Sequence, residues 1–456
     1  MPLLLAVSPA WAQPPANPGG GDASWVESYR EPASRIIGEA LGSTRAWDRL
    51  AELGDTFGHR LSGSAALEDA IAWAVARMQE DGLENVRAEP VLVPHWVRGV
   101  ESAEIVEPSP RRPLPMLGLG MSVGTPPEGI VAEALVVGSF DELTRRAKDA
   151  RGRIVVFNVP FTTYGQTVRY RSAGATEAAR HGAAGMLLRS VGPPGLRTPH
   201  TGTLSYDPAV SRIPAAAITV EDADLLQRMQ DRGTRTMIRL TMGARQLPDA
   251  PSANVVAEWR GREKPEEVIV LGGHFDSWDV GTGSTDDGGG CVAVWEAVRI
   301  LRALGLRPRR TIRVVLFTNE ENGLRGGLGY RDLHREELSN HVLMLEVDGG
   351  VFRPLGFGVT AGAASLQRMR EIGSLLTAID AHRVTPGGGG ADIGPSVEAG
   401  RVPAASLNVD GSKYFLIHHT DADTIDKIEP SDLQKCVAAL AVAAYVVADM
   451  PERLVR

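Results

Sequence analysis

Imidazole and carboxylate side chains gather in several short stretches of the C-terminal half of this sequence. Residues 272–276 read Gly-Gly-His-Phe-Asp, and residues 286–290 read Asp-Asp-Gly-Gly-Gly. One such stretch means little, because acidic residues are common in loops and a lone histidine is more often structural than catalytic. Several of them on one chain form a pattern that can bind metal. The candidates are His274, Asp276, Asp286, Asp287, Glu320, Glu321, Asp348, His418 and His419.

The chemistry of these donors favours two divalent cations. Carboxylates that crowd together repel one another unless a cation compensates their charge. Imidazole and carboxylate ligands without thiolates suit zinc, with manganese or cobalt as alternatives. The set is too large for one catalytic zinc with three protein ligands, and it suits two ions about 3.5–4 Å apart. Such a pair lowers the pKa of a bound water to about 7 and polarises a scissile carbonyl.

Two sequence spacings suggest which side chains bind metal, which acts as general base and which orients a ligand. Adjacent residues of an extended chain point in opposite directions, so one of Glu320 and Glu321 can bind metal while the other faces the attacking water as general base. Asp276 lies two residues after His274, so its carboxylate is predicted to share a side with the imidazole and to orient it. The alternatives are a solvated loop for Asp276 and a charged surface loop for the glutamates.

Three apolar runs must position these residues. Residues 268–271, 311–318 and 342–347 are continuous apolar or mainly apolar runs, as expected for strands buried on both faces of a mainly parallel sheet. Each run ends at candidate ligands, and ligands bind outside the carboxyl ends of such strands. Strands that alternate with helices predict an α/β fold, with a mixed, mainly parallel sheet sandwiched by helices.

The rest of the chain is predicted to support this unit. Residues 33–86 have a helical pattern, with Ser64 as a helix cap, and residues 86–97 are predicted to form a strand. Residues 98–245 alternate short β-rich runs with short helices and are predicted to form a separate α/β insert without chemistry of its own. The last helix is predicted to follow a capping box made by Ser431 and Gln434.

Composition excludes several classes of function. The chain has 456 residues, which suggests two or three domains, and a formal net charge of -8 without a clustered basic face. This argues against nucleic-acid binding and against a polybasic membrane patch. The apolar run 437–448 is too short to span a bilayer. Cys291 and Cys436 are predicted to be buried free thiols, with a disulfide between them as the alternative.

The first residues resemble the end of a secretory signal. Residues 3–7 are apolar, and Ala10, Trp11 and Ala12 fit an A-x-A processing site. We therefore expect export to the periplasm or secretion. Residues 1–24 are predicted to be a signal remnant and linker, residues 25–97 with 246–456 the main domain, and residues 98–245 the insert.

Taken together, these motifs in this order resemble the M28 metallopeptidases. They include the run from His274 to Asp279, Asp286 with its glycines, Glu320-Glu321, Asp348-Gly, and His419 with Asp423-Thr424. The resemblance covers nearly the whole chain after the signal-like segment. It implies a zinc-exopeptidase fold with a protease-associated domain as the insert, short peptide substrates with a free amino end, and a homodimer.

The resemblance also implies a role for each residue. His274 and Asp348 would bind one zinc, Glu321 and His419 the other, and Asp286 would bridge the two ions. Glu320 would be the general base. His418 occupies a position where some relatives carry a tyrosine that assists the oxyanion, so its role is open. The competing hypotheses are an aminopeptidase on longer peptides, a non-catalytic receptor-like binding module, and hydrolysis of another amide on the same site.

Overall fold

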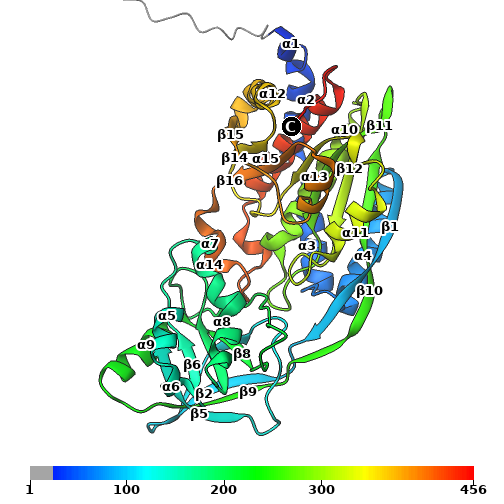
Figure 1. Cartoon of the computed structure of the whole chain (residues 1–456). Coiled ribbons are helices and arrows are strands. Elements are labelled where there is room, and N and C mark those ends of the chain that lie inside the picture. Colours follow the sequence, from blue (N-terminus) through cyan, green and yellow to red (C-terminus); the bar gives the residue numbers. More distant parts are fainter. Residues whose placement is uncertain (1–23) are drawn as a thin grey trace, which may run out of the picture.

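The computed structural model describes residues 24–456, which form two sheets of eight strands (Figure 1). The predicted signal remnant and most of the predicted linker lie outside the described residues. The larger sheet carries the candidate ligands. Its strands, in spatial order, are β1 (Glu84–Val97), β10 (Arg245–Trp259), β12 (Arg310–Phe317), β11 (Lys264–His274), β13 (His341–Glu346), β16 (Ala404–Val409), β14 (Pro354–Thr360) and β15 (Arg383–Pro386).

The centre of this sheet is parallel and its flanks are mixed. β12, β11, β13 and β16 are parallel neighbours, whereas β1, β10 and β12 pair antiparallel, as do β14 and β16. The predicted mixed, mainly parallel sheet is therefore confirmed. The three predicted apolar runs correspond to β11, β12 and β13, and the carboxyl ends of these strands meet at one edge.

Helices cover both faces of the larger sheet. Along β11, Ile269 and Leu271 belong to one apolar core, and Val268 and Val270 belong to the other, as the alternation of side chains along a strand requires. The larger core packs on α2 (Arg30–Gly42), α3 (Arg45–Phe57), α4 (Ala65–Glu80), α10 (Gly289–Ala303), α12 (Ala363–Gly373) and α15 (Pro430–Asp449), and the smaller core on α11 (Arg325–Leu333) and α13 (Gly394–Gly400).

Two of these helices test the predicted caps. The hydroxyl of Ser64 accepts a hydrogen bond from the backbone N–H of Leu67, so the predicted cap of α4 is confirmed. The predicted capping box of α15 is wrong. This helix begins at Pro430 after Glu429, without a side-chain cap, and the Gln434 amide donates to the carbonyl of Ser43 instead. Proline is favoured at the first position of a helix, because its φ is already helical and its missing N–H would have no partner within the helix.

α15 is also longer than the apolar run indicated. It has 20 residues and is long and apolar enough to cross a membrane, but 78% of its most apolar window is buried inside the protein. Its apolarity is accounted for by its place in the larger core. Cys436 on this helix and Cys291 on α10 are both buried and free, so the prediction of free thiols is confirmed and the disulfide is excluded.

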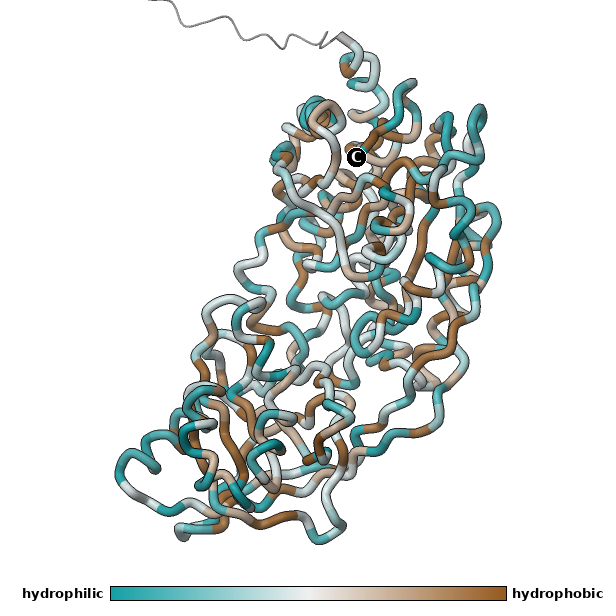
Figure 2. The backbone as a smooth tube through the Cα atoms, viewed as in Figure 1, coloured by the Kyte–Doolittle hydropathy of each residue, from teal (hydrophilic) through white to brown (hydrophobic). Residues whose placement is uncertain are grey.

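The segment between β1 and β10 builds the second sheet. Apolar residues on its two faces form two cores of their own. Figure 2 shows hydrophobic stretches along the strands of both sheets. In spatial order the strands are β3 (Arg112–Leu114), β2 (Glu101–Glu107), β9 (Met237–Met242), β5 (Ile130–Val137), β6 (Ile154–Phe157), β7 (Gly185–Arg189), β8 (Ala215–Ile218) and β4 (Met116–Gly118). The helices are α5 (Phe140–Arg145), α6 (Ala147–Ala150), α7 (Tyr164–Thr167), α8 (Arg169–Arg180) and α9 (Val220–Asp231).

Candidate metal centre

The predicted ligands come together at the carboxyl edge of the larger sheet. His274 is the last residue of β11, Glu321 follows β12, and Asp348 follows β13. Asp286 lies in the turn that leads into α10, and His419 follows α14 (Tyr414–Ile417). Parallel neighbouring strands end at the same edge, which is why residues far apart in the sequence meet here.

Asp286 stands at the centre of this group. Its Oδ1 lies 3.1 Å from Nε2 of His274, and its Oδ2 lies 3.2 Å from Nε2 of His419. On one side, His274 Nε2 is also 3.4 Å from Oδ1 of Asp348. On the other side, His419 Nε2 is 3.1 Å from Oε2 of Glu321. The five residues thus form two groups that share one carboxylate.

Burial makes this arrangement costly without compensating charge. His274, Asp286, Glu321 and His419 are all buried, while the Asp348 side chain is 30% exposed. Burial would raise the pKa of Asp286, but hydrogen bonds from His274 and His419 hold it well below its usual range. One oxygen of Glu321 is buried without a hydrogen-bond partner among residues 24–456. An unpaired carboxylate oxygen beside imidazoles and other carboxylates fits the donor set of a divalent cation.

The neighbouring Asp287 faces the other way. Its carboxylate accepts hydrogen bonds from the backbone N–H groups of His274, at 3.1 Å, and of Gly290, at 3.2 Å. Burial raises its pKa well above the usual range, and the carboxylates of Asp348 and Asp286 add to this rise. The structure therefore places Asp286, not Asp287, between the two imidazoles.

Asp276 departs from the predicted geometry. His274 Nδ1 lies 2.9 Å from the main-chain oxygen of Asp276, whereas the Asp276 carboxylate is 3.9 Å from that nitrogen. The carboxylate instead accepts the backbone N–H groups of Glu320, at 3.0 Å, and Glu321, at 3.3 Å. The prediction that this carboxylate orients the imidazole is wrong, because β11 ends at His274 and the alternation of a strand does not extend to residue 276.

The two glutamates lie in the turn that follows β12, and both line the same cavity. Glu321 contacts His419, and the Glu320 side chain lies at the wall of a cavity of about 900 Å³. Burial raises the pKa of Glu320 well above its usual range; the His274 charge opposes this rise, and the charges of Asp348 and Glu321 add to it. Asp276 fixes the backbone of this turn, so it positions both glutamates.

His418 lies directly beside the ligands. Its ring stacks on that of His419 with centroids 3.5 Å apart, and its Nε2 is 3.6 Å from Oδ2 of Asp286. Nδ1 of His418 has no hydrogen-bond partner in the described part of the chain. Its backbone carbonyl accepts from Nδ1 of His200, a residue of the segment 98–245.

Two buried residues that hold the ligand loops were missed by sequence reasoning. The Asp423 carboxylate accepts the backbone N–H of Thr285 at 2.7 Å and that of Asp286 at 3.1 Å. The fixed spacing of Asp423 after His419 was a signal for this role. The fully buried Arg60 donates to the carbonyl oxygens of Phe275, Gly58, Thr282 and Gly283. No local pattern marks Arg60, because its partners lie more than 200 residues away, apart from Gly58.

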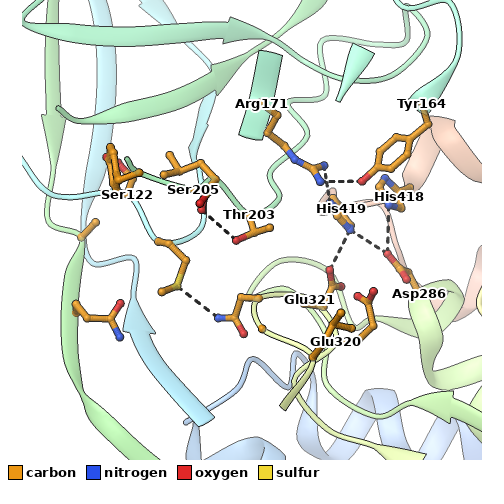
Figure 3. A pocket seen from close by; sticks show the side chains of 18 of the residues that line it. Ser122, Tyr164, Arg171, Thr203, Ser205, Asp286, Glu320, Glu321, His418 and His419 are labelled. Atoms are coloured by element: carbon orange, nitrogen blue, oxygen red, sulfur yellow. Dashed lines mark hydrogen bonds and ion pairs between the residues drawn. The ribbon is translucent and has the colours of Figure 1, made fainter. Parts of the chain in front are cut away.

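The segment 98–245, which the sequence predicted as a separate insert, supplies one wall of the cavity. In Figure 3, Arg171 and Tyr164 reach towards His419 and His418 from one side, and Glu321 and Asp286 approach from the other. Nη1 of Arg171 lies 3.4 Å from Nδ1 of His419. The part of the wall that comes from this segment includes Met121, Ser122, Val123, Gly124, Tyr164, Arg171, Thr203, Leu204, Ser205, Tyr206, Arg212 and Ala244.

Comparisons with known proteins agree with this geometry. The sequence profile of peptidase family M28 matches residues 254–444. Carboxypeptidase Q of Homo sapiens is 48% identical over 434 residues, which cover 94% of this chain and 92% of that protein. The chain belongs to peptidase family M28. Carboxypeptidase Q of Xenopus laevis is also 48% identical, with the same coverage.

Solved structures extend the comparison to the fold of this M28 peptidase. The crystal structure of a peptidase M28 precursor from Shewanella amazonensis superposes with a TM-score of 0.89 at 36% identity and covers 94% of this chain and 99% of that one. A zinc aminopeptidase from Bacillus subtilis shares the fold, with a TM-score of 0.68, 21% identity and coverage of 90% and 96%. The predicted zinc-exopeptidase fold is confirmed, and the protein is a metal-dependent exopeptidase.

The role of Asp423 gives a testable prediction. Asp423→Asn replaces one of the two acceptor oxygens that hold the Asp286 loop with a donor. Outer-shell changes of this kind typically lower metal affinity about 10- to 100-fold, and we expect this range in a competition titration against a chromogenic chelator. Asp421→Asn is the matched control, because Asp421 is exposed and close in sequence. Equal metal affinity in the two variants would contradict the role of Asp423.

Proposed function

We propose that this protein hydrolyses dipeptides and other short peptides at a site that holds two zinc ions, with manganese or cobalt as alternative metals. The observation that carries the proposal is the position of Asp286 between two groups of ligands. His274 and Asp348 would hold one ion, and Glu321 and His419 the other. Asp286 touches an imidazole of each group through a different oxygen, as a bridging carboxylate must.

Bound zinc would supply a water of lowered pKa and polarise the carbonyl of the scissile bond. Glu320 lines the cavity beside the ligands and has no ion-pair partner among residues 24–456. It would take a proton from the attacking water and return it to the leaving amine. Asp276 would keep Glu320 in place through the hydrogen bond to its backbone N–H.

His418 has a separate role in this proposal. Its ring is buried and fixed between His419 and the ring of Tyr414, with centroids 5.0 Å apart in the latter pair. It lines the cavity beside Asp286. A donor at this place would stabilise the oxyanion that forms when water attacks the carbonyl.

The proposal of short substrates rests on the family resemblance of the sequence. The cavity is bounded by the larger sheet on one side and by the segment 98–245 on the other. The protein is similar over nearly its full length to proteins named carboxypeptidase Q.

We infer that residues 98–245 act as a protease-associated domain on a catalytic domain made of residues 25–97 and 246–456. Export and homodimerisation remain predictions from the N-terminal pattern and the family resemblance.

The general base can be tested by Glu320→Gln. This variant keeps the shape of the side chain but cannot take a proton, so we expect full metal content and a rate lower by about a hundredfold to ten-thousandfold. Metal analysis and steady-state kinetics on one dipeptide check both parts. Glu336→Gln, at an exposed position, is the control and is expected to keep the wild-type rate. A fully active Glu320→Gln variant would overturn the assignment.

Metal dependence and substrate size can be tested with one panel. Dipeptides, tripeptides and end-blocked peptides are offered to the purified protein before and after chelation, and the metal is counted by mass spectrometry. We expect two metal ions per chain, loss of activity on chelation, recovery with zinc, and fastest cleavage of dipeptides. Undiminished activity after rigorous metal removal would contradict the two-metal proposal. Equally fast cleavage of long peptides would instead favour an aminopeptidase.

A further inference from the structure

The imidazole of His419 is held by a residue of the segment 98–245. Nδ1 of His419 lies 3.2 Å from the backbone carbonyl oxygen of Thr201. When Nε2 of a histidine binds a metal ion, the proton sits on Nδ1, which here donates to this carbonyl. A hydrogen bond of this kind fixes the orientation of a ligating imidazole and raises its basicity. Thr201 therefore orients His419 from a distant part of the chain.

The same segment holds the backbone around His419. The N–H of Thr201 donates to the carbonyl of His419 at 2.9 Å, and Nδ1 of the buried His200 donates to the carbonyl of His418 at 2.8 Å. His419 has φ +60°, in the left-handed region that few residues other than glycine adopt. Such a conformation persists when the surrounding structure determines it. Residues 200 and 201 thus fix both the backbone and the ring of this ligand.

The opposite side of the metal centre is held by loops of the larger sheet. Nδ1 of His274 donates to the carbonyl of Asp276 at 2.9 Å, and the backbone N–H of Asp286 donates to the carboxylate of Asp423 at 3.1 Å. The two proposed ion sites therefore differ in their support. The site that includes His274 is supported from within the part of the chain that carries the larger sheet, whereas the site that includes His419 depends on where the segment 98–245 lies.

A buried arginine ties Thr201 to the loop that follows β11. Arg98 lies in the connection between β1 and β2, and its side chain is 11% exposed. Its Nε donates to Oδ2 of Asp279, in the loop after β11, at 2.8 Å. The guanidinium also donates to the carbonyl of Gly118, which accepts the hydroxyl of Thr201 at 2.7 Å. Arg98 thus keeps Thr201 in its place beside the metal centre.

We propose that the segment 98–245 completes the ion site of Glu321 and His419, with His200 and Thr201 as positioning residues. This inference rests on the proposed two-metal centre. Loss of the contact would release the ion at this site first, while the other ion stays bound. Because coupling free energies between two binding events are reciprocal, the ion would in turn stabilise the contact between Thr201 and His419.

The first test removes the hydrogen bond that His200 donates. Leucine and asparagine branch at the same atom, but only asparagine can place a donor where Nδ1 lies in the histidine. We expect His200→Leu to lower the affinity for one of two zinc ions about 10- to 100-fold, and His200→Asn to restore most of it. A competition titration against a chromogenic chelator gives both affinities, and metal analysis after dialysis counts the ions that remain.

The matched control is His181→Leu. It makes the same substitution at a half-exposed histidine at the end of α8, in the same segment. We expect this variant to keep both zinc affinities of the wild type. Thermal unfolding of the metal-free variants checks that each one folds. Unchanged zinc affinities in a folded His200→Leu variant would overturn the inference.

A double-mutant cycle shows whether His200 acts through His419. We expect His419→Ala to bind one zinc ion. Adding His200→Leu to it should leave the affinity for this remaining ion unchanged, because the contact supports only the site that is already lost. If the second substitution weakens the remaining ion as much as it weakens zinc binding in the wild type, His200 has only a general structural role and the inference is wrong.

Hydrogen exchange tests the coupling without any substitution at His200. Zinc loading of the wild type should slow the exchange of amides in residues 198–204 about 10- to 100-fold, since the ion and the contact stabilise each other. The amides of α5 and α6 serve as the internal control and should exchange at the same rate in both forms. Equal exchange of residues 198–204 with and without zinc would overturn the inference even if no His200 variant folds.

The zinc titrations also separate this inference from the proposed function. A single ion in the wild type, weakened by His200→Leu, would contradict the two-metal centre while the role of the segment stands. Two ions in the wild type, bound equally well by His200→Leu, would overturn the role of the segment while the two-metal centre stands. A wild-type protein that binds no zinc would contradict both.

Discussion

The burial of Asp286 between two imidazoles is the interaction on which the rest of the site depends. A carboxylate in such a place is stable only when positive charge surrounds it on both sides. Here His274 and His419 approach its two oxygens separately, and each imidazole is accompanied by a further carboxylate, Asp348 or Glu321. The alternation of imidazole and carboxylate places ligand atoms for cations on both sides of Asp286.

The protein holds this arrangement mainly through backbone groups. Asp423 and Asp287 accept the N–H groups of the ligand loops, and Asp276 does the same for the turn of Glu320 and Glu321. Arg60 binds carbonyl oxygens of the loop after β11. These buried charged side chains fix the conformations of the loops through hydrogen bonds to the backbone. The fixed loops in turn determine where the metal ligands lie.

The sequence predicted what depends on local pattern and on the rules of parallel sheets. The apolar runs at 268–271, 311–318 and 342–347 correctly predicted three strands that are neighbours in the sheet. The residues that follow these runs were the predicted ligands. Long-range contacts were beyond this reasoning. The Asp276 carboxylate points away from His274 because the strand ends there. Arg60 and Arg171 each also contact residues more than 200 positions away in the sequence. The segment 98–245 carries no motif, yet it closes the cavity with Arg171, because its position relative to the larger sheet is a property of the whole fold.

The central claim is that Asp286 joins two metal ions. Anomalous diffraction from crystals of the zinc-loaded protein, recorded on both sides of the zinc absorption edge, tests it most directly. Two peaks are expected, one in contact with His274 and Asp348, the other with Glu321 and His419, and both in contact with Asp286. A single peak at full occupancy, or two peaks of which only one touches Asp286, would contradict it.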